Sequence, residues 1–311
     1  MSLVTPVALF IFNRPDLTEI VFEQIRSAKP KKLLVVADGP RFPQEAEKCE
    51  KARKIIERVD WHCEVLTNFS EKNIGCGIRV STGLDWVFSE VEEAIILEDD
   101  CLPTASFFYF CQTLLEYYKH DQRIMHISGN NFQLGKSRTE YSYYFSRYPH
   151  SWGWASWRRA WKYFDQGMKN YTDFKKANVI KLICENPYEQ NYWTSIFDRM
   201  FEGVSDTWDY QWFYACLAQN GLSILPNSNL VSNIGFRSDA THTCGESPWE
   251  RLPTSDIWEI EHPPFIIRHR EADDYTFDYL FGGKFMKEND RLPAKIRKRL
   301  SIVKRKIKSW L

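Results

Sequence analysis

The stretch AIILEDD, residues 94–100, decides the expected fold. Its first four residues are uniformly apolar, which is typical of a strand that is buried on both faces of a parallel sheet. Three acids follow directly: Glu98, Asp99 and Asp100. Because side chains alternate along a strand, at least one of these carboxylates must face the crevice at the carboxyl end of the sheet, where α/β proteins bind ligands.

Two earlier apolar runs end in polar turns in the same way. Residues 6–12 stop at NRPD, residues 13–16, and residues 33–37 stop at DGP, residues 38–40. The segment between them has apolar residues at helical spacing, which predicts a helix with Asp16 as its N-cap. The same alternation continues with a helix near 44–58, a short strand at 63–66, and a Gly-rich loop at 73–77 that leads into a helix ending near 88.

This order of elements predicts the α/β class: a mostly parallel, Rossmann-like sheet flanked by helices, with right-handed crossovers. Residues 102–104 open another helix, and residues 124–127 form a further strand. The chain then becomes irregular and rich in aromatic residues between 142 and 212. No Pro- or Ser-rich linker separates this part, so we expect one composite domain.

Composition excludes several classes of protein. Lys and Arg balance Asp and Glu at 41 each, so the chain is not a general nucleic-acid binder. The eight cysteines contain no C-x-x-C pair, which indicates buried free thiols rather than a zinc site. The apolar run at 7–12 is too short for a signal peptide, and no run approaches the ~20 apolar residues of a membrane span. We therefore expect a cytoplasmic address.

Clustered carboxylates repel one another unless a hard divalent cation bridges them, so the acidic triplet predicts a Mg²⁺ or Mn²⁺ site; a solvated acidic turn is the alternative. Asp38 closes the second strand on the same edge and can accept hydrogen bonds from a base or from ribose, or it can be simple turn chemistry. Arg14 follows the first strand and can pair with a phosphate or with Asp38, or lie on the surface.

The order of these motifs resembles N-acetylglucosaminyltransferase I and its bacterial family 2-like relatives, which are inverting, metal-dependent glycosyltransferases of the GT-A fold. The likeness covers residues 4–130 and continues more loosely to His242. The residues that carry it are NR at 13–14, DG at 38–39, EDD at 98–100 and FF at 107–108.

The resemblance implies a role for each matching position. Asp100 binds the metal, Asp99 faces the ribose or the donor sugar, and Glu98 supports them. Arg14 lies near the phosphates and Asp38 at the uracil end of a UDP-sugar, the favoured donor. The helix at 81–86 departs from the family, because Gly83 stands where the eukaryotic enzyme has a nucleotide-contacting histidine.

Three more positions follow from the resemblance. An inverting transfer needs a general base for the acceptor hydroxyl, and the motif WDY at 208–210 places Asp209 in that role, with Asp206 as the competitor and a helix cap as the structural alternative. Gly153 and Trp154 match a glycine-aromatic loop near the donor sugar, although the tryptophans here also fit a buried stripe.

The polar loop at 233–243 is of a kind that orders over a bound nucleotide. Its His242 can complete the metal sphere or touch the diphosphate; an ordinary surface histidine is the alternative. The chain thus divides into a nucleotide-sugar half (1–130), an acceptor-side half (131–285) and a basic tail (286–311). The tail predicts an amphipathic helix that either lies on an anionic membrane or packs on the body.

The sequence therefore predicts an enzyme that moves a sugar from a nucleotide diphosphate to an acceptor hydroxyl, on a saccharide or a lipid-linked saccharide of a bacterial surface-polysaccharide or glycolipid pathway. Two alternatives stay open. One is a nucleotidyltransferase that makes sugar nucleotides, although such enzymes place a Gly-rich phosphate loop where FNRP, residues 12–15, stands here. The other is a non-catalytic carbohydrate- or nucleotide-binding protein.

Overall fold

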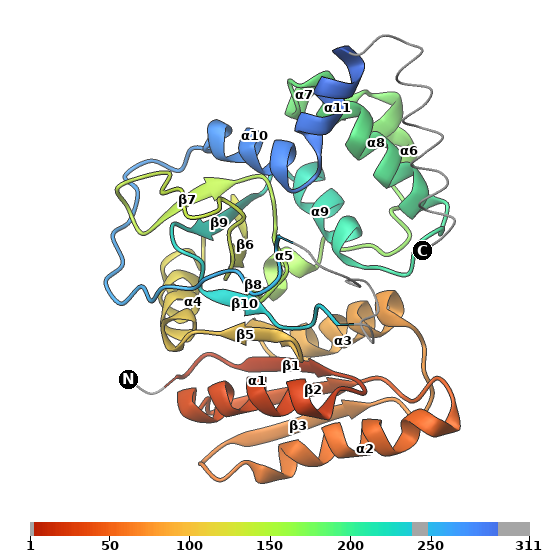
Figure 1. The fold of residues 1–311 in the computed structure, drawn as a ribbon, viewed down its shortest axis with the longest axis vertical. Helices are drawn as coiled ribbons and strands as arrows, with labels where there is room; N and C mark the ends of the chain where they lie inside the picture. Colours follow the sequence, from red (N-terminus) through yellow and green to blue (C-terminus); the bar gives the residue numbers. More distant parts are fainter. Residues whose placement is uncertain (1–2, 238–247, 292–311) are drawn as a thin grey trace.

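A single large sheet forms the centre of the computed structural model, which describes residues 3–237 and 248–291 (Figure 1). The sheet has eight strands in the order β3-β2-β1-β4-β8-β6-β9-β7. Its strands are β1 (Val7–Ile11), β2 (Lys32–Ala37), β3 (Glu64–Phe69), β4 (Glu93–Glu98), β6 (Ile124–Ser128), β7 (Tyr143–Ser146), β8 (Trp154–Trp157) and β9 (Leu222–Pro226).

The predicted mostly parallel α/β sheet is confirmed. Strands β3, β2, β1 and β4 pair in parallel, and so do β6 and β9. Strand β8 lies antiparallel between β4 and β6, and β7 lies antiparallel at the edge beside β9. The polar turns that follow β1, β2 and β4 therefore meet at one edge of the sheet, as the sequence predicted.

Helices cover both faces of the sheet. Their bounds are α1 (Pro15–Ala28), α2 (Ala46–Lys54), α3 (Cys76–Glu90), α4 (Ala105–Tyr117), α5 (Arg158–Trp161), α6 (Tyr171–Lys176), α7 (Val179–Ile183), α8 (Pro187–Phe201), α9 (Asp209–Ala218), α10 (Arg270–Tyr279) and α11 (Gly283–Arg291), with the 3₁₀ turns η1 (Pro43–Glu45) and η2 (Ile55–Arg58) on either side of α2.

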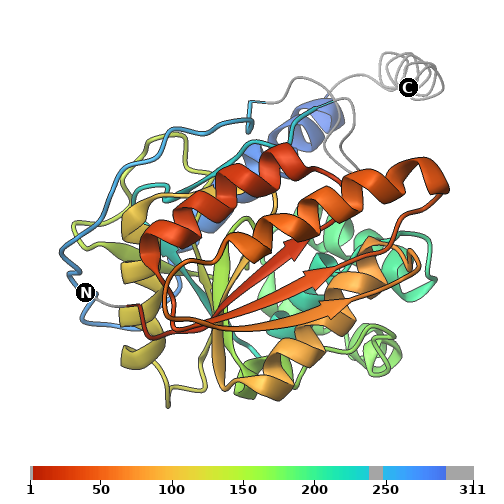
Figure 2. The same cartoon turned by 90° about the horizontal axis from the view of Figure 1, so that it is seen from below.

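Alternation along the strands decides which helices lie on which face. In β1, Val7, Leu9 and Ile11 pack in the core that contains α1, α2 and α4. Ala8 and Phe10 face the opposite core, which contains α3, α5 and part of α9. Figure 2 shows α1 and α2 side by side across the first of these faces. Because β1 is covered on both sides, it is apolar throughout.

One local expectation was wrong and one was correct only in part. Asp16 does not cap α1; the helix begins at Pro15, which suits the first helical position because that residue needs no N–H donor, and Asp16 lies in the first turn. The helix expected to open at residues 102–104 is present as α4, with Thr104 as its N-cap, but Leu102 and Pro103 precede it in a strand. This short strand, β5 (Cys101–Pro103), pairs with β10 (Val231–Asn233) in a separate two-stranded sheet.

The aromatic-rich half is more regular than predicted. Its strands β7, β8 and β9 belong to the main sheet, and α6, α8 and α9 pack around a core of aromatic side chains that includes Tyr171, Trp193, Phe197 and Phe213. In Figure 1, α6, α8 and α11 form the end of the molecule farthest from β3 and α2. The aromatic residues are thus mainly core.

Two predictions concern the ends and the thiols. The seven described cysteines are free, and five of them are buried, as predicted. Among the described residues no helix is long and apolar enough to cross a bilayer. Of the predicted basic tail only residues 286–291 are described, as the end of α11, and the remainder lies outside the described residues.

Candidate functional site

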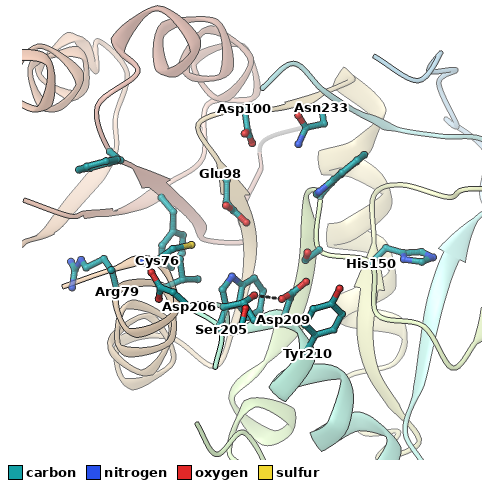
Figure 3. A pocket seen from close by; sticks show the side chains of 18 of the residues that line it. Cys76, Arg79, Glu98, Asp100, His150, Ser205, Asp206, Asp209, Tyr210 and Asn233 are labelled. Carbon is teal, nitrogen blue, oxygen red and sulfur yellow. Dashed lines mark hydrogen bonds between the residues drawn. The ribbon is translucent and has the colours of Figure 1, made fainter. Parts of the chain in front are cut away.

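A cavity of about 730 Å³ lies at the carboxyl ends of β1, β2 and β4. One wall comes from the turns after these strands and from the start of α3, and the other from residues 148–152, residues 205–210 and the segment after α10. Its size is within the range of pockets that hold small molecules and cofactors. Figure 3 shows Glu98, Asp100 and Asn233 facing this space from one side, and Asp209 and Tyr210 from α9.

Arg14 joins the acidic triplet rather than Asp38. Its guanidinium donates to Asp99 and forms an ion pair with Asp100 at 2.9 Å between Nη2 and Oδ2. Burial disfavours the charge on Arg14, but the two carboxylates outweigh burial and raise its pKa. The pairing is possible because β1 and β4 are neighbours in the sheet, which brings the residues after their ends together.

The triplet carries more negative charge than Arg14 balances. Burial raises the pKa of Glu98 to about 8, and repulsion from Asp100 and Asp99 adds to this effect. Burial also raises the pKa of Asp99 to about 6, against the opposing effect of Arg14. Such crowding of carboxylates in a cleft is typical of a site that binds a cation or moves a proton.

The residues that follow β10 in the two-stranded sheet fix the position of Asp100. The backbone N–H of Ile234 donates to the carbonyl of Asp100 at 2.9 Å, and Asn233 accepts from the N–H of Gly235 at 2.8 Å. A Cβ added at Gly235 would lie 2.1 Å from Oδ2 of Asp100. Only a glycine therefore allows the chain after β10 to pass so close to this carboxylate.

Asp38 also lines the cavity, among polar groups. It is buried and accepts from the backbone N–H groups of Gly39 and Ile74 at 2.9 and 3.1 Å. Burial raises the pKa of Asp38, while these hydrogen bonds oppose the shift. Arg79 is also buried here, and its guanidinium donates to the carbonyl oxygens of Ala37 and Asn68.

Asp209 is the first residue of α9 and lines the cavity. The N-cap of the helix is Trp208, so Asp209 does not act as the cap. Its carboxylate accepts a hydrogen bond from the hydroxyl of Thr207 and is close enough to Glu98 to raise the pKa of that group. The geometry leaves Asp209 facing the acids across the cavity (Figure 3).

Asp206 makes a different set of contacts. Its two carboxylate oxygens accept from the backbone N–H groups of Cys76 and Gly77 at 3.0 and 2.7 Å. These are the first residues of α3, where unpaired N–H groups favour a negative charge. Asp206 therefore ties the loop before α9 to the opposite wall of the cavity.

Gly153 and Trp154 do not line the cavity. The Trp154 side chain is 1% exposed and stacks on His126 and Trp208. Gly153 has φ +66°, and a Cβ there would lie 2.8 Å from Val231. The tryptophan of this loop that lines the cavity is Trp152. Trp154 thus belongs to the core, which was the alternative interpretation of the stripe.

Several lining residues gave no signal in the sequence that identified them. Arg79 lies one turn into α3, and Tyr192 and Phe281 come from α8 and from the segment after α10. Only Arg79 follows a motif, the Gly-rich loop at 73–77. Gly83 does not line the cavity. A Cβ there would lie 2.7 Å from Phe10 and from Val36, which explains why α3 carries a glycine where it packs on the sheet.

The described part of the chain contains no complete metal site formed by protein side chains alone. Within residues 3–237 and 248–291 no three His, Cys, Asp or Glu side chains are arranged to hold a metal ion by themselves. His242, the predicted additional ligand, lies outside the described residues.

No family model matches the chain, and no curated protein matches its sequence. Among solved structures, UDP-glucose pyrophosphorylase complexed with UDP-glucose matches with 14% identity and a TM-score of 0.26, over 46% of this chain and 62% of that one. The galactosyltransferase LgtC, in complex with donor and acceptor sugar analogues, matches with 8% identity and a TM-score of 0.36, over 68% and 70% of the two chains. At these scores neither likeness carries a conclusion about function.

Proposed function

We propose that the protein is a metal-dependent glycosyltransferase that moves a sugar from a nucleotide diphosphate, with UDP favoured, to an acceptor hydroxyl with inversion. One observation carries the proposal. A single cavity at the carboxyl ends of parallel strands has crowded carboxylates with one arginine on one wall, and a further carboxylate, Asp209, on the other.

The nucleotide fits along the strand ends. Asp38 is the acceptor for an N–H of the base or a ribose hydroxyl, since a carboxylate that takes two backbone N–H bonds still has lone pairs to offer. Asp99 faces the ribose or the donor sugar. Arg14 forms ion pairs with Asp99 and Asp100 and is the proposed cation for the diphosphate.

Mg²⁺ or Mn²⁺ is the proposed cofactor. Mg²⁺ is usually held by one or two carboxylates together with substrate phosphates. The described residues contain no group of three side chains that could hold a metal ion, which is compatible with this type of Mg²⁺ site. The repulsion among Glu98, Asp99 and Asp100 supports a divalent cation at this site. Asp100 would hold the cation, with His242 as a further candidate, and the bound ion would neutralise the diphosphate leaving group.

Asp209 is the proposed general base. It takes the proton of the acceptor hydroxyl, the acceptor oxygen bonds to the anomeric carbon, and the bond from that carbon to the diphosphate oxygen breaks with its electron pair. The hydrogen bond from Thr207 orients the carboxylate, and Asp206 is less suited because both its oxygens bind the start of α3.

The cellular setting remains part of the proposal. The resemblance to bacterial family 2-like enzymes favours surface-polysaccharide or glycolipid synthesis, on a saccharide or lipid-linked acceptor, at the cytoplasmic face. A basic tail at 286–311 would hold the enzyme against anionic lipid there. Co-flotation with anionic vesicles tests this part, and equal flotation of full-length and tail-deleted protein contradicts it.

Release of the nucleoside diphosphate tests the reaction itself. Purified protein with Mn²⁺ is incubated with UDP-, GDP- and dTDP-sugars and a mixture of saccharide acceptors, and the products are separated by ion-exchange chromatography. We expect one donor class to release its diphosphate. Pyrophosphate formed from a nucleoside triphosphate and a sugar phosphate would instead support the nucleotidyltransferase, and binding without turnover the non-catalytic protein.

A further inference from the structure

Polar side chains join the turns after β1 and β2 beside the cavity. Glu45, in the 3₁₀ turn η1, accepts from the side-chain amide of Asn13 at 2.9 Å. Glu45 also accepts from the backbone N–H and from the Nε of Arg41, each at 3.0 Å. Glu45 is only 6% exposed, so these bonds replace the water that a carboxylate would otherwise bind. Arg41 is therefore held at a fixed place relative to the end of β1.

Arg41 itself is exposed and lines the cavity. Its side chain is 46% exposed, and Phe12, Asn13 and Asp38 line the same part of the wall. The guanidinium lies over the ring of Phe12, with 5.4 Å between Cζ and the ring centroid. Nε and Nη2 donate to Glu45, whereas Nη1 makes no hydrogen bond with the described residues. Because a guanidinium has five N–H donors, Arg41 can still bind an anion in the cavity.

Arg41 and Arg14 are paired with different carboxylates. Arg14 pairs with Asp99 and Asp100 after β4, where the divalent cation is proposed to bind. Arg41 pairs with Glu45, on the side of β2. One cation of the cavity thus depends on the acids of the proposed metal site, and the other does not.

The order of the strands puts Arg41 between the two ends of the proposed nucleotide. β1 lies between β2 and β4, and neighbouring strands are about 4.8 Å apart, so the ends of β2 and β4 are separated by about 10 Å. A nucleotide that has its base or ribose at Asp38 and its diphosphate at Asp100 crosses the end of β1 beside Phe12. The group that lies between the ribose and the rest of the diphosphate is the α-phosphate.

We infer that Arg41 binds the α-phosphate of the nucleotide in a subsite that works without the metal ion. The inference rests on the proposed function for the direction in which the nucleotide lies. It adds a class of ligand, because a nucleoside monophosphate binds this subsite in the absence of Mn²⁺. Glu45 holds the guanidinium in place for it.

Binding of nucleoside monophosphates tests the inference. The full-length protein is titrated by calorimetry with UMP, GMP, dTMP and CMP and with their nucleosides, in EDTA and in Mn²⁺. We expect one monophosphate to bind in EDTA at least about tenfold more tightly than its nucleoside, and adding Mn²⁺ to change its affinity by less than roughly threefold. Arg41→Gln should weaken this monophosphate at least about tenfold and leave the nucleoside within roughly threefold.

Two further variants separate binding from folding. Arg41→Gln leaves the buried Glu45 without its cation, so the double variant Arg41→Gln/Glu45→Gln removes both charges and should show the same loss for the monophosphate. Arg58→Gln is the matched control. Arg58 also pairs with glutamates, lies over a phenylalanine ring and is 42% exposed, but it does not line the cavity. Circular dichroism establishes that each variant is folded.

Four results would overturn the inference. They are no monophosphate binding in EDTA, affinity no higher than that of the nucleoside, unchanged binding by the folded double variant, and an equal loss in Arg58→Gln.

Titration with nucleotide sugars in Mn²⁺ separates the two proposals. If a nucleotide sugar binds with Mn²⁺ but no monophosphate binds without it, the Arg41 subsite fails while the donor site stands. If a monophosphate binds through Arg41 but no nucleotide sugar is turned over with any acceptor, the subsite stands and the proposed transferase function fails.

Discussion

Replacing Asp206 by asparagine should weaken the protein without removing its chemistry. The carboxylate accepts from the N–H groups of Cys76 and Gly77, which begin α3 and lie 129 or more residues away in the chain. A hydrogen bond to a charged group contributes about 1.5–3 kcal/mol, and a negative charge at a helix N-terminus adds about 0.3–1 kcal/mol.

Asparagine keeps one oxygen acceptor and loses the charge and the other. Because Asp206 is exposed, the low ends of these ranges apply, and we expect a loss of roughly 1.5 kcal/mol in the free energy of unfolding. At about 2–4 °C per kcal/mol for a chain of this size or slightly smaller, Tm should fall by roughly 3–6 °C.

Thermal unfolding followed by near-UV circular dichroism at pH 7 measures the shift, with Glu202→Gln as a control that removes an exposed charge near the end of α8. Sugar transfer by the folded Asp206→Asn protein should stay within a few-fold of wild type. Unchanged Tm would refute the contact as a stabilising tie. A loss of transfer of 100-fold or more with unchanged Tm would make Asp206 the base.

Three further predictions follow from the site and the core. Asp209→Asn should lower the rate of transfer roughly 10²–10⁴-fold while nucleotide binding is retained. Steady-state kinetics measures this rate, and an unchanged rate would contradict the role of Asp209 as the base. Gly235→Ala places a Cβ 2.1 Å from Oδ2 of Asp100, so metal-dependent nucleotide binding measured by calorimetry should weaken at least tenfold; unchanged affinity would count against this packing. Burial lowers the pKa of His126 from 6.5 to about 3. Below pH 6.5 the unfolded chain therefore binds a proton at this residue and the folded chain does not. The free energy of unfolding is thus highest above pH 6.5 and falls as the pH is lowered. Relative to His126→Gln, wild type should lose about 1.4 kcal/mol per pH unit between 6.5 and 4 in urea unfolding, and parallel curves would exclude a buried neutral histidine.

The strand ends were predictable because they depend on local pattern. Fully apolar runs identified β1, β2 and β4, and a parallel sheet brings the residues after them to one edge whatever their sequence separation. The acidic triplet and Asp38 therefore line one cavity, as expected. Strand β5 was missed because it has three residues and ends in proline, a pattern that also opens a helix.

Long-range pairings could not be predicted from the sequence. Arg14 follows β1, which has β2 on one side and β4 on the other; the sequence suggested Asp38 after β2 as its partner, whereas the structure pairs it with Asp99 after β4. Trp152 and Trp154 are two residues apart, so plain alternation would place both on one face. Gly153 between them has a left-handed backbone, which sends Trp152 to the cavity and Trp154 to the core.

A thermal-shift panel tests the central claim, that the acidic triplet holds a nucleotide diphosphate sugar with a divalent cation, most directly. UDP-, GDP-, dTDP- and CMP-sugars are compared with and without Mn²⁺, on wild type and on Asp100→Asn. The account predicts stabilisation by one nucleotide class, with UDP favoured, that requires Mn²⁺ and is lost in the variant. Stabilisation by none of them, or an equal shift in Asp100→Asn, would contradict it.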